Sequence, residues 1–113
     1  LNDEYGHAAG DRVLVQLAAM LRAESRRDDL VGRIGGEEFA ILLPATDLAA
    51  GLRHAERLRL AAHAIRRPDG ALTISIGVAV GTGEERLEAL LARADQAMRE
   101  AKRDGRDRVT SAA

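Results

Sequence analysis

A pair of glycines between two apolar runs constrains the fold of this chain more than any other feature. Gly35 and Gly36 separate the runs 30–34 and 39–43. Apolar runs of this length joined by Gly-Gly predict a β-hairpin, because both glycines can adopt a positive φ without steric cost. Glu37 and Glu38 follow at once, and carboxylates beside bare backbone suit a divalent cation and a closely approaching ligand. The alternative is a solvated hairpin with an acidic rim, and these residues alone favour that alternative.

The rest of the chain alternates between helical and extended patterns. Apolar spacing predicts a helix over 13–23, preceded by a short helical turn and a loop because glycines interrupt the first eleven residues. It also predicts a helix over 48–65, capped by Thr46 or Asp47, and a helix over 87–103 with Gly105 just past its end. Strict alternation predicts a strand over 71–80, and 108–110 suits a short edge strand. These elements predict an α+β fold with an antiparallel sheet covered by helices.

Composition excludes several classes of function. The chain has 113 residues, enough for one domain with a hydrophobic core, and 46% of them are hydrophobic. Its 17 basic and 18 acidic residues leave a net charge of −1, which disfavours nucleic-acid binding and contact with a membrane surface. Cysteine is absent, so disulfides and thiolate metal sites are excluded. No apolar run approaches the roughly 20 residues that span a bilayer.

Six segments in order carry a family resemblance. Gly35-Gly36-Glu37-Glu38-Phe39 matches the GGEEF form of the signature of GGDEF-domain diguanylate cyclases. The other segments that resemble this family are Asn2 to Asp11, Leu43-Pro44 with Thr46-Asp47, Ala55-Glu56-Arg57, Thr73 to Gly77, and Ala94 to Ala97 followed by Ala101-Lys102 and Gly105-Arg106. The resemblance runs along nearly the whole chain and therefore does not depend on the five signature residues.

The resemblance implies a palm-like, ferredoxin-type fold that condenses two GTP molecules into cyclic di-GMP and releases pyrophosphate. Each domain would bind one GTP, and two domains would face each other as a homodimer. Mg²⁺ (or Mn²⁺) would neutralise the triphosphate. The resemblance also implies a bacterial signalling protein in which this domain is an effector module fused to a sensor or receiver domain. The domain would lie in the cytoplasm, and in some parents it would be attached to a membrane sensor.

The resemblance also assigns roles to residues of the signature and of the third helix. Glu37 would ligate Mg²⁺ and is the usual candidate for the base, although activation of the hydroxyl by the metal is at least as consistent with the weak basicity of a carboxylate. Gly35 and Gly36 would let the nucleotide lie against the backbone. Lys102 and Arg106, spaced i and i+4, would hold the β- and γ-phosphates. Cations that complement the helix dipole are the alternative for this pair.

The N-terminal segment would bind the base of the nucleotide. Asn2 and Asp11 would recognise guanine, since an amide and a carboxylate suit its O6 acceptor and its N–H donors. His7 belongs to the same motif and either contacts the nucleotide or only fixes the loop.

A second motif lies upstream of the signature. Arg26 and Asp29 match the family's RxxD inhibitory site at the expected offset from Gly35, and Arg57 resembles the additional arginine of that site. Arginine suits a bidentate hold on phosphate or guanine. We therefore expect allosteric product inhibition by cyclic di-GMP at these three residues.

The main departure from the family is the absence of its first strand, which carries an aspartate ligand of the metal. We expect residues 1–113 to be a single, N-terminally incomplete domain that is inactive as it stands, within a parent that is a cyclase. Two other functions stay open. One is a non-catalytic receptor that binds cyclic di-GMP or GTP, and the other is a structural or dimerisation module without a ligand.

Overall fold

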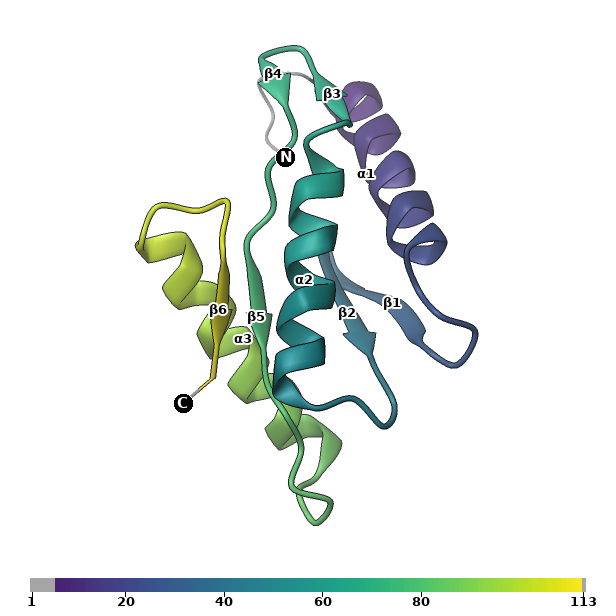
Figure 1. Cartoon of the computed structure of the whole chain (residues 1–113). Helices are drawn as coiled ribbons and strands as arrows, with labels where there is room; N and C mark the ends of the chain where they lie inside the picture. Colours follow the sequence, from purple (N-terminus) through teal and green to yellow (C-terminus); the bar gives the residue numbers. More distant parts are fainter. Residues whose placement is uncertain (1–5, 113) are drawn as a thin grey trace. The chain divides into compact units, whose positions relative to one another are not determined.

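The computed structural model describes residues 6–112, with side chains from residue 10 onward. This part of the chain has an α+β structure of three helices and six strands (Figure 1). In chain order the elements are α1 (Gly6–Ala23), β1 (Leu30–Gly35), β2 (Glu38–Leu42), α2 (Leu48–Ala62), β3 (Arg66–Arg67), β4 (Gly70–Ala71), β5 (Ile76–Val78), α3 (Leu87–Arg103) and β6 (Val109–Ser111). The strands pair as three two-stranded sheets, β1–β2, β3–β4 and β5–β6.

The chain divides into two compact units. The first comprises Leu1–Pro44 and Ala61–Leu72, and the second comprises Ala45–Leu60 and Thr73–Ala113. The first unit therefore holds α1, the β1–β2 hairpin and the small β3–β4 hairpin. The second holds most of α2 together with β5, α3 and β6. The expectation of a single domain stays a prediction.

Helix α1 is longer than the sequence predicts. We expected a turn and a loop before a helix over 13–23, and the helix instead begins at Gly6. Val13, Leu17 and Leu21 are buried at helical spacing, with 6%, 6% and 4% of their surface exposed. Burial of this apolar stripe outweighs the cost of about 1 kcal/mol for a glycine such as Gly10 inside a helix. Sequence reasoning gave the glycines too much weight.

The β1–β2 hairpin is confirmed, with an irregularity beside its turn. The strands are antiparallel from Leu30 opposite Leu42 to Gly35 opposite Glu38, and the register shifts between Arg33 and Gly35. Such a shift is a β-bulge, which bends a strand and redirects its side chains. The bulge therefore lies directly before the glycine pair.

The predicted strand over 71–80 is wrong in extent. Only Gly70–Ala71 and Ile76–Val78 are strands, and residues 72–75 between them are not. β4 pairs with β3 inside the first unit, whereas β5 pairs with β6 inside the second. Alternation reveals that one face of a segment is apolar, but it does not reveal where partner strands begin and end. The change of partner breaks the strand.

The second unit is built on α3. β5 and β6 run parallel, with Ile76 opposite Val109, and α3 packs against both strands. The parallel direction follows from the connection, because a helix between two strands returns the chain to the same end of the sheet. The edge strand predicted over 108–110 is thus present, one residue later, but in a parallel pair. Ala97 and Ala101 of α3 are buried.

No helix in the described residues is long and apolar enough to cross a membrane.

Candidate functional site

The signature hairpin has its turn one residue later than predicted. Gly35 pairs with Glu38, so the two turn residues are Gly36 and Glu37. Glu37 is exposed at the tip of the hairpin. The expected positive φ is wrong for both glycines, since the described glycines with positive φ are Gly70, Gly83 and Gly105. The turn conformation therefore does not require glycine at either signature position.

Packing does not require glycine there either. A Cβ added to Gly35 or Gly36 would meet no atom within 4 Å. Both glycines are exposed. Their effect on the free protein is to leave a stretch of bare backbone at the surface beside the Glu37 carboxylate. A bare backbone of this kind permits the close approach of a ligand.

Arg33 is a site residue that sequence reasoning missed. Its Nε donates a hydrogen bond to the carbonyl oxygen of Gly36 at 2.9 Å, and its Nη2 bonds the same oxygen. The guanidinium thereby holds the turn and places a positive charge beside it. The available signal was a charged residue inside an otherwise apolar run, directly before the glycine pair.

The metal-binding residues are few. Among the described residues, no group of three or more histidine, cysteine, aspartate or glutamate side chains is placed to hold a metal ion. The exposed Glu37 carboxylate fits the chemistry of Mg²⁺, which prefers one or two carboxylates together with substrate phosphates and water. Magnesium binding stays a prediction.

The upstream motif forms a compact turn. The Arg26 amide donates to Asp29 Oδ2 at 2.8 Å, and the Asp29 amide donates back to the Arg26 carbonyl at 3.1 Å. The side chain of Asp29 is 1% exposed, whereas that of Arg26 is 62% exposed and reaches Asp29 Oδ1 at 3.5 Å. The aspartate therefore shapes the turn in the free protein, and the arginine is the member of the motif that is accessible to a ligand.

Arg57 is the predicted third member of this motif. It is exposed on α2, and its Nη2 lies 2.7 Å from Nδ1 of the buried His54. Arg57 belongs to the second unit, and Arg26 and Asp29 belong to the first. Their grouping into one site stays a prediction.

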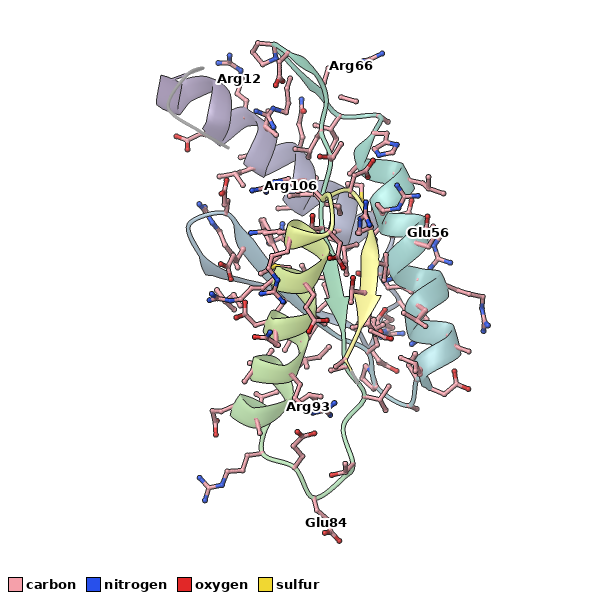
Figure 2. All side chains as sticks on the ribbon, turned by 90° about the vertical axis from the view of Figure 1, so that its left-hand side faces the viewer. Arg12, Glu56, Arg66, Glu84, Arg93 and Arg106 are labelled. Carbon is pink, nitrogen blue, oxygen red and sulfur yellow. The ribbon has the colours of Figure 1, made fainter. Side chains whose placement is uncertain are left out.

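The two predicted phosphate-binding cations lie at the end of α3, where Figure 2 labels Arg106. Lys102 is half-buried in the last turn of the helix, and Arg106 is exposed three residues beyond its end. Arg106 is therefore not on the helix, and the i, i+4 interval between these two residues does not place both side chains on one helical face. Both cations belong to the second unit and Glu37 to the first, so a joint site stays a prediction.

The chain leaves α3 through a Schellman-type cap. Gly105 has φ 127°, and the Arg106 amide donates to the carbonyl of Ala101 at 2.9 Å. This is the C′ role that we predicted for Gly105. Arg106 and Asp107 also have positive φ, at 62° and 48°.

The predicted guanine-binding residues are described only in part. Asn2 lies outside the described residues, as does the side chain of His7. Asp11 is exposed on α1, in the first unit. Guanine recognition by these residues stays a prediction.

The sequence as a whole matches a known family. Residues 1–108 match the family model "Diguanylate cyclase, GGDEF domain". The chain is 47% identical to diguanylate cyclase DgcP of Pseudomonas aeruginosa over 113 residues, which cover 96% of this chain and 17% of that relative. The chain therefore corresponds to a small part of that protein.

Solved structures share the fold. The GGDEF domain of DgcB from Caulobacter crescentus, crystallised in complex with c-di-GMP, is 32% identical, with a TM-score of 0.90 over 98% of this chain and 69% of that one. The active GGEEF domain of a diguanylate cyclase from Vibrio cholerae is 31% identical, with a TM-score of 0.85 over 99% of this chain and 74% of that one. These likenesses confirm the fold class that the sequence predicts.

Proposed function

This chain belongs to the GGDEF-domain family of diguanylate cyclases, and we propose that within its full-length protein it condenses two GTP molecules into cyclic di-GMP. The observation that carries the proposal is the bare Gly35-Gly36 backbone beside the exposed Glu37 carboxylate. Neither glycine is required by the turn or by packing, so a ligand that approaches the backbone is the remaining physical reason for them.

The reaction consists of two equivalent phosphoryl transfers. In each one, the 3′-hydroxyl of one GTP gives up its proton to Glu37 or to water and attacks the α-phosphorus of the other. A new P–O bond forms, the bond from that phosphorus to the bridging oxygen breaks, and pyrophosphate leaves with the bonding electron pair. Each domain holds one GTP, so two copies of the domain must face each other. The proposed assembly is therefore a homodimer, brought together by a sensor or receiver domain elsewhere in the full-length protein.

The charge of each site residue of this chain suits a different part of the reaction. Glu37 would hold Mg²⁺ or Mn²⁺, which when bound would neutralise the triphosphate and polarise the attacking hydroxyl. Lys102 and Arg106 would hold the β- and γ-phosphates of the bound GTP. Asn2 and Asp11 would select guanine, and His7 would support them. GTP is a cytoplasmic nucleotide, so the proposed location of the domain is the cytoplasm.

Product inhibition is the second part of the proposal. Arg26 would bind a phosphate or guanine edge of cyclic di-GMP, with Asp29 and Arg57 completing the site. The exposed Arg26 guanidinium and the tight turn that carries it support this role, because the turn presents the cation without further ordering.

The experiment that tests catalysis compares glycine variants of one hairpin. Full-length protein is incubated with GTP and Mg²⁺, and cyclic di-GMP is measured by mass spectrometry. Gly36→Ala is expected to fold normally, because its Cβ meets nothing, and to lose most activity through crowding of the nucleotide. Gly32→Ala is the matched control, since that glycine also has no atom within 4 Å of an added Cβ and lies in β1 of the same hairpin, away from the turn. Equal activity of the two variants would contradict the proposal that the nucleotide lies against the bare backbone of the turn.

A Glu37→Gln variant tests the metal role in the same assay. Loss of product with unchanged folding supports the proposal. Absence of product from the unsubstituted full-length protein would exclude the cyclase, and binding of cyclic di-GMP by that inactive protein would identify a receptor.

A further inference from the structure

The loop after α3 has an unusual backbone. Gly105, Arg106 and Asp107 have φ of 127°, 62° and 48°, so three successive residues adopt conformations that side chains other than glycine rarely accept. Two of the three are not glycine. A conformation of this kind persists only where the surroundings impose it.

The backbone of Arg106 is held on both sides. Its amide donates to the Ala101 carbonyl at 2.9 Å, and its own carbonyl accepts a hydrogen bond from Arg108 Nε at 3.1 Å. The Arg106 side chain is exposed, and Figure 2 shows it on the loop at the end of α3. The direction in which this cation leaves the surface therefore depends on the loop backbone.

Asp107, the next residue, is tied to a distant helix. Arg59 on α2 donates from Nη1 to Asp107 Oδ1 at 3.0 Å and to the Asp107 carbonyl at 3.5 Å. Arg59 is itself fixed by Glu56, whose two carboxylate oxygens accept from Arg59 Nε at 2.9 and 3.1 Å. One guanidinium thus joins a helical carboxylate to both the side chain and the backbone of the strained loop.

Burial distinguishes this contact from an ordinary surface ion pair. The Arg59 side chain is 18% exposed. Its hydrogen bond to Glu56, and to a smaller extent its hydrogen bond to Asp107, raise the pKa of Arg59 above its ordinary value. Arg99 and Asp95 on α3 form a pair of the same chemistry at 2.8 Å, but Arg99 is 64% exposed. Exposed helical pairs of that kind contribute little.

We propose that Arg59 and Asp107 are positioning residues that hold the loop after α3 so that Arg106 is aimed at its phosphate ligand. This inference rests on the proposed role of Arg106 in GTP binding. Glu56 completes the arrangement by restricting Arg59 to the rotamer that reaches the loop.

Enzyme kinetics on the full-length protein test the inference. Arg59→Ala and Asp107→Ala are each expected to lower kcat/KM for GTP by about 10- to 100-fold, the range typical of residues that orient others, mainly through a higher KM. Arg99→Ala, which removes the exposed pair of the same type, should leave kcat/KM unchanged. Losses confined to kcat, or an equal loss in Arg99→Ala, would contradict the proposal.

A double-mutant cycle separates positioning from a general structural role. If Arg59 acts through Arg106, then Arg59→Ala causes no further loss in a protein that already carries Arg106→Ala. Multiplicative losses would show that Arg59 acts independently and would overturn the inference. If Arg59→Ala fails to fold, Asp107→Ala removes the same contact from the loop side and takes its place in the cycle.

Amide hydrogen exchange gives a readout that does not depend on activity. Arg59→Ala is expected to accelerate exchange of the Arg106 amide by at least about tenfold, with the interior of α3 unchanged. Unchanged exchange at Arg106 would overturn the inference even in an active cyclase. Conversely, accelerated exchange in a protein that binds no GTP would refute the proposed function while leaving the tie between Arg59 and the loop established.

Discussion

Gly77 in β5 lies directly against the backbone of α3 at Ala94. A Cβ at Gly77 would overlap the Ala94 carbonyl oxygen and the amide nitrogen of Met98, and it would lie 3.0 Å from the carbonyl carbon of Ala97. All three are backbone atoms of one helix, so no side chain can move aside. The packing of α3 on the β5–β6 sheet therefore requires glycine at this position.

Gly77→Ala is expected to destabilise the protein by at least about 3 kcal/mol, since helix and strand must separate to admit one methyl group. The free energy of unfolding from urea titration is the measurement. Gly51→Ala is the matched control: its Cβ would meet only Val78 Cγ1 at 3.5 Å, an ordinary contact. Because Gly51 lies inside α2, alanine there should stabilise by roughly 0.5–1 kcal/mol. Similar losses in both variants would contradict the packing argument.

Asp47 caps α2. Its Oδ1 accepts a hydrogen bond from the Ala50 amide at 2.8 Å, and its carbonyl accepts the first helical bond from Gly51 at 2.9 Å. Asp47→Ala leaves the Ala50 amide without this acceptor and should cost about 1 kcal/mol of unfolding free energy. Asp47→Asn retains a side-chain oxygen and should remain close to the unsubstituted protein. If asparagine costs as much as alanine, the cap is not the source of the effect.

The ion pair between Glu85 and Arg93 predicts a dependence of stability on pH. Arg93 donates to Glu85 at 2.8 and 2.7 Å and to the Val80 carbonyl at 2.5 Å, and Figure 2 shows Arg93 beside the loop that carries Glu84. The hydrogen bonds from Arg93 lower the pKa of Glu85 below its ordinary value of 4.5. A carboxyl group whose pKa is lowered in the folded protein stabilises the fold at pH values above its ordinary pKa. This stabilisation disappears as the pH falls through the folded-state pKa.

Glu85→Gln should therefore be less stable than the unsubstituted protein at neutral pH, and the difference should shrink at successive pH values below 4.5. Urea midpoints across that range measure the difference. Glu84→Gln, which changes the exposed neighbour of Glu85, is the control. Its stability difference from the unsubstituted protein should not shrink in this way as the pH falls. If the difference in stability persists unchanged at low pH, then Glu85→Gln destabilises the protein through packing and not through loss of charge.

Because the carboxylate of Asp29 is buried and the guanidinium of Arg26 is exposed, substitutions at these two residues should affect different properties, namely stability for Asp29 and ligand affinity for Arg26. Asp29→Ala removes the acceptor for the Arg26 amide and should cost about 1 kcal/mol. Arg26→Ala keeps that backbone bond and should leave stability within about 0.5 kcal/mol. Titration with cyclic di-GMP should nonetheless show that Arg26→Ala binds more weakly. Unchanged affinity in Arg26→Ala would exclude this turn as the inhibitory site.

Several features followed from the sequence because their physical causes are local. The hairpin over 30–42 follows from two apolar runs and a short turn, and the helix over 87–103 follows from its apolar period. The Asp47 cap and the Gly105 helix end depend on groups within a few residues of each other. Such interactions are encoded by neighbours in the chain, and the family signature is itself a short local pattern.

The site could be assigned only in outline. Glu37 and Arg26 were identified by motif, and the structure shows both exposed. Arg33 was missed, although it holds the signature turn, because nothing in an apolar run with one arginine says which carbonyl that arginine will reach. The positive φ expected at Gly35 and Gly36 was wrong, since a two-residue turn is set by strand register and the bulge moved that register.

The sequence alone determined the family, the fold class, the presence of the three long helices, and the existence of the hairpin over 30–42. Tertiary structure alone decided where the strand over 71–80 breaks, that Asp29 is buried, and that Arg59 reaches Asp107, 48 residues further along the chain. The physical reason is the range of the interactions. Caps, turns and helical periods act between close neighbours in sequence, whereas strand partners, burial and long-range ion pairs exist only after distant segments have packed.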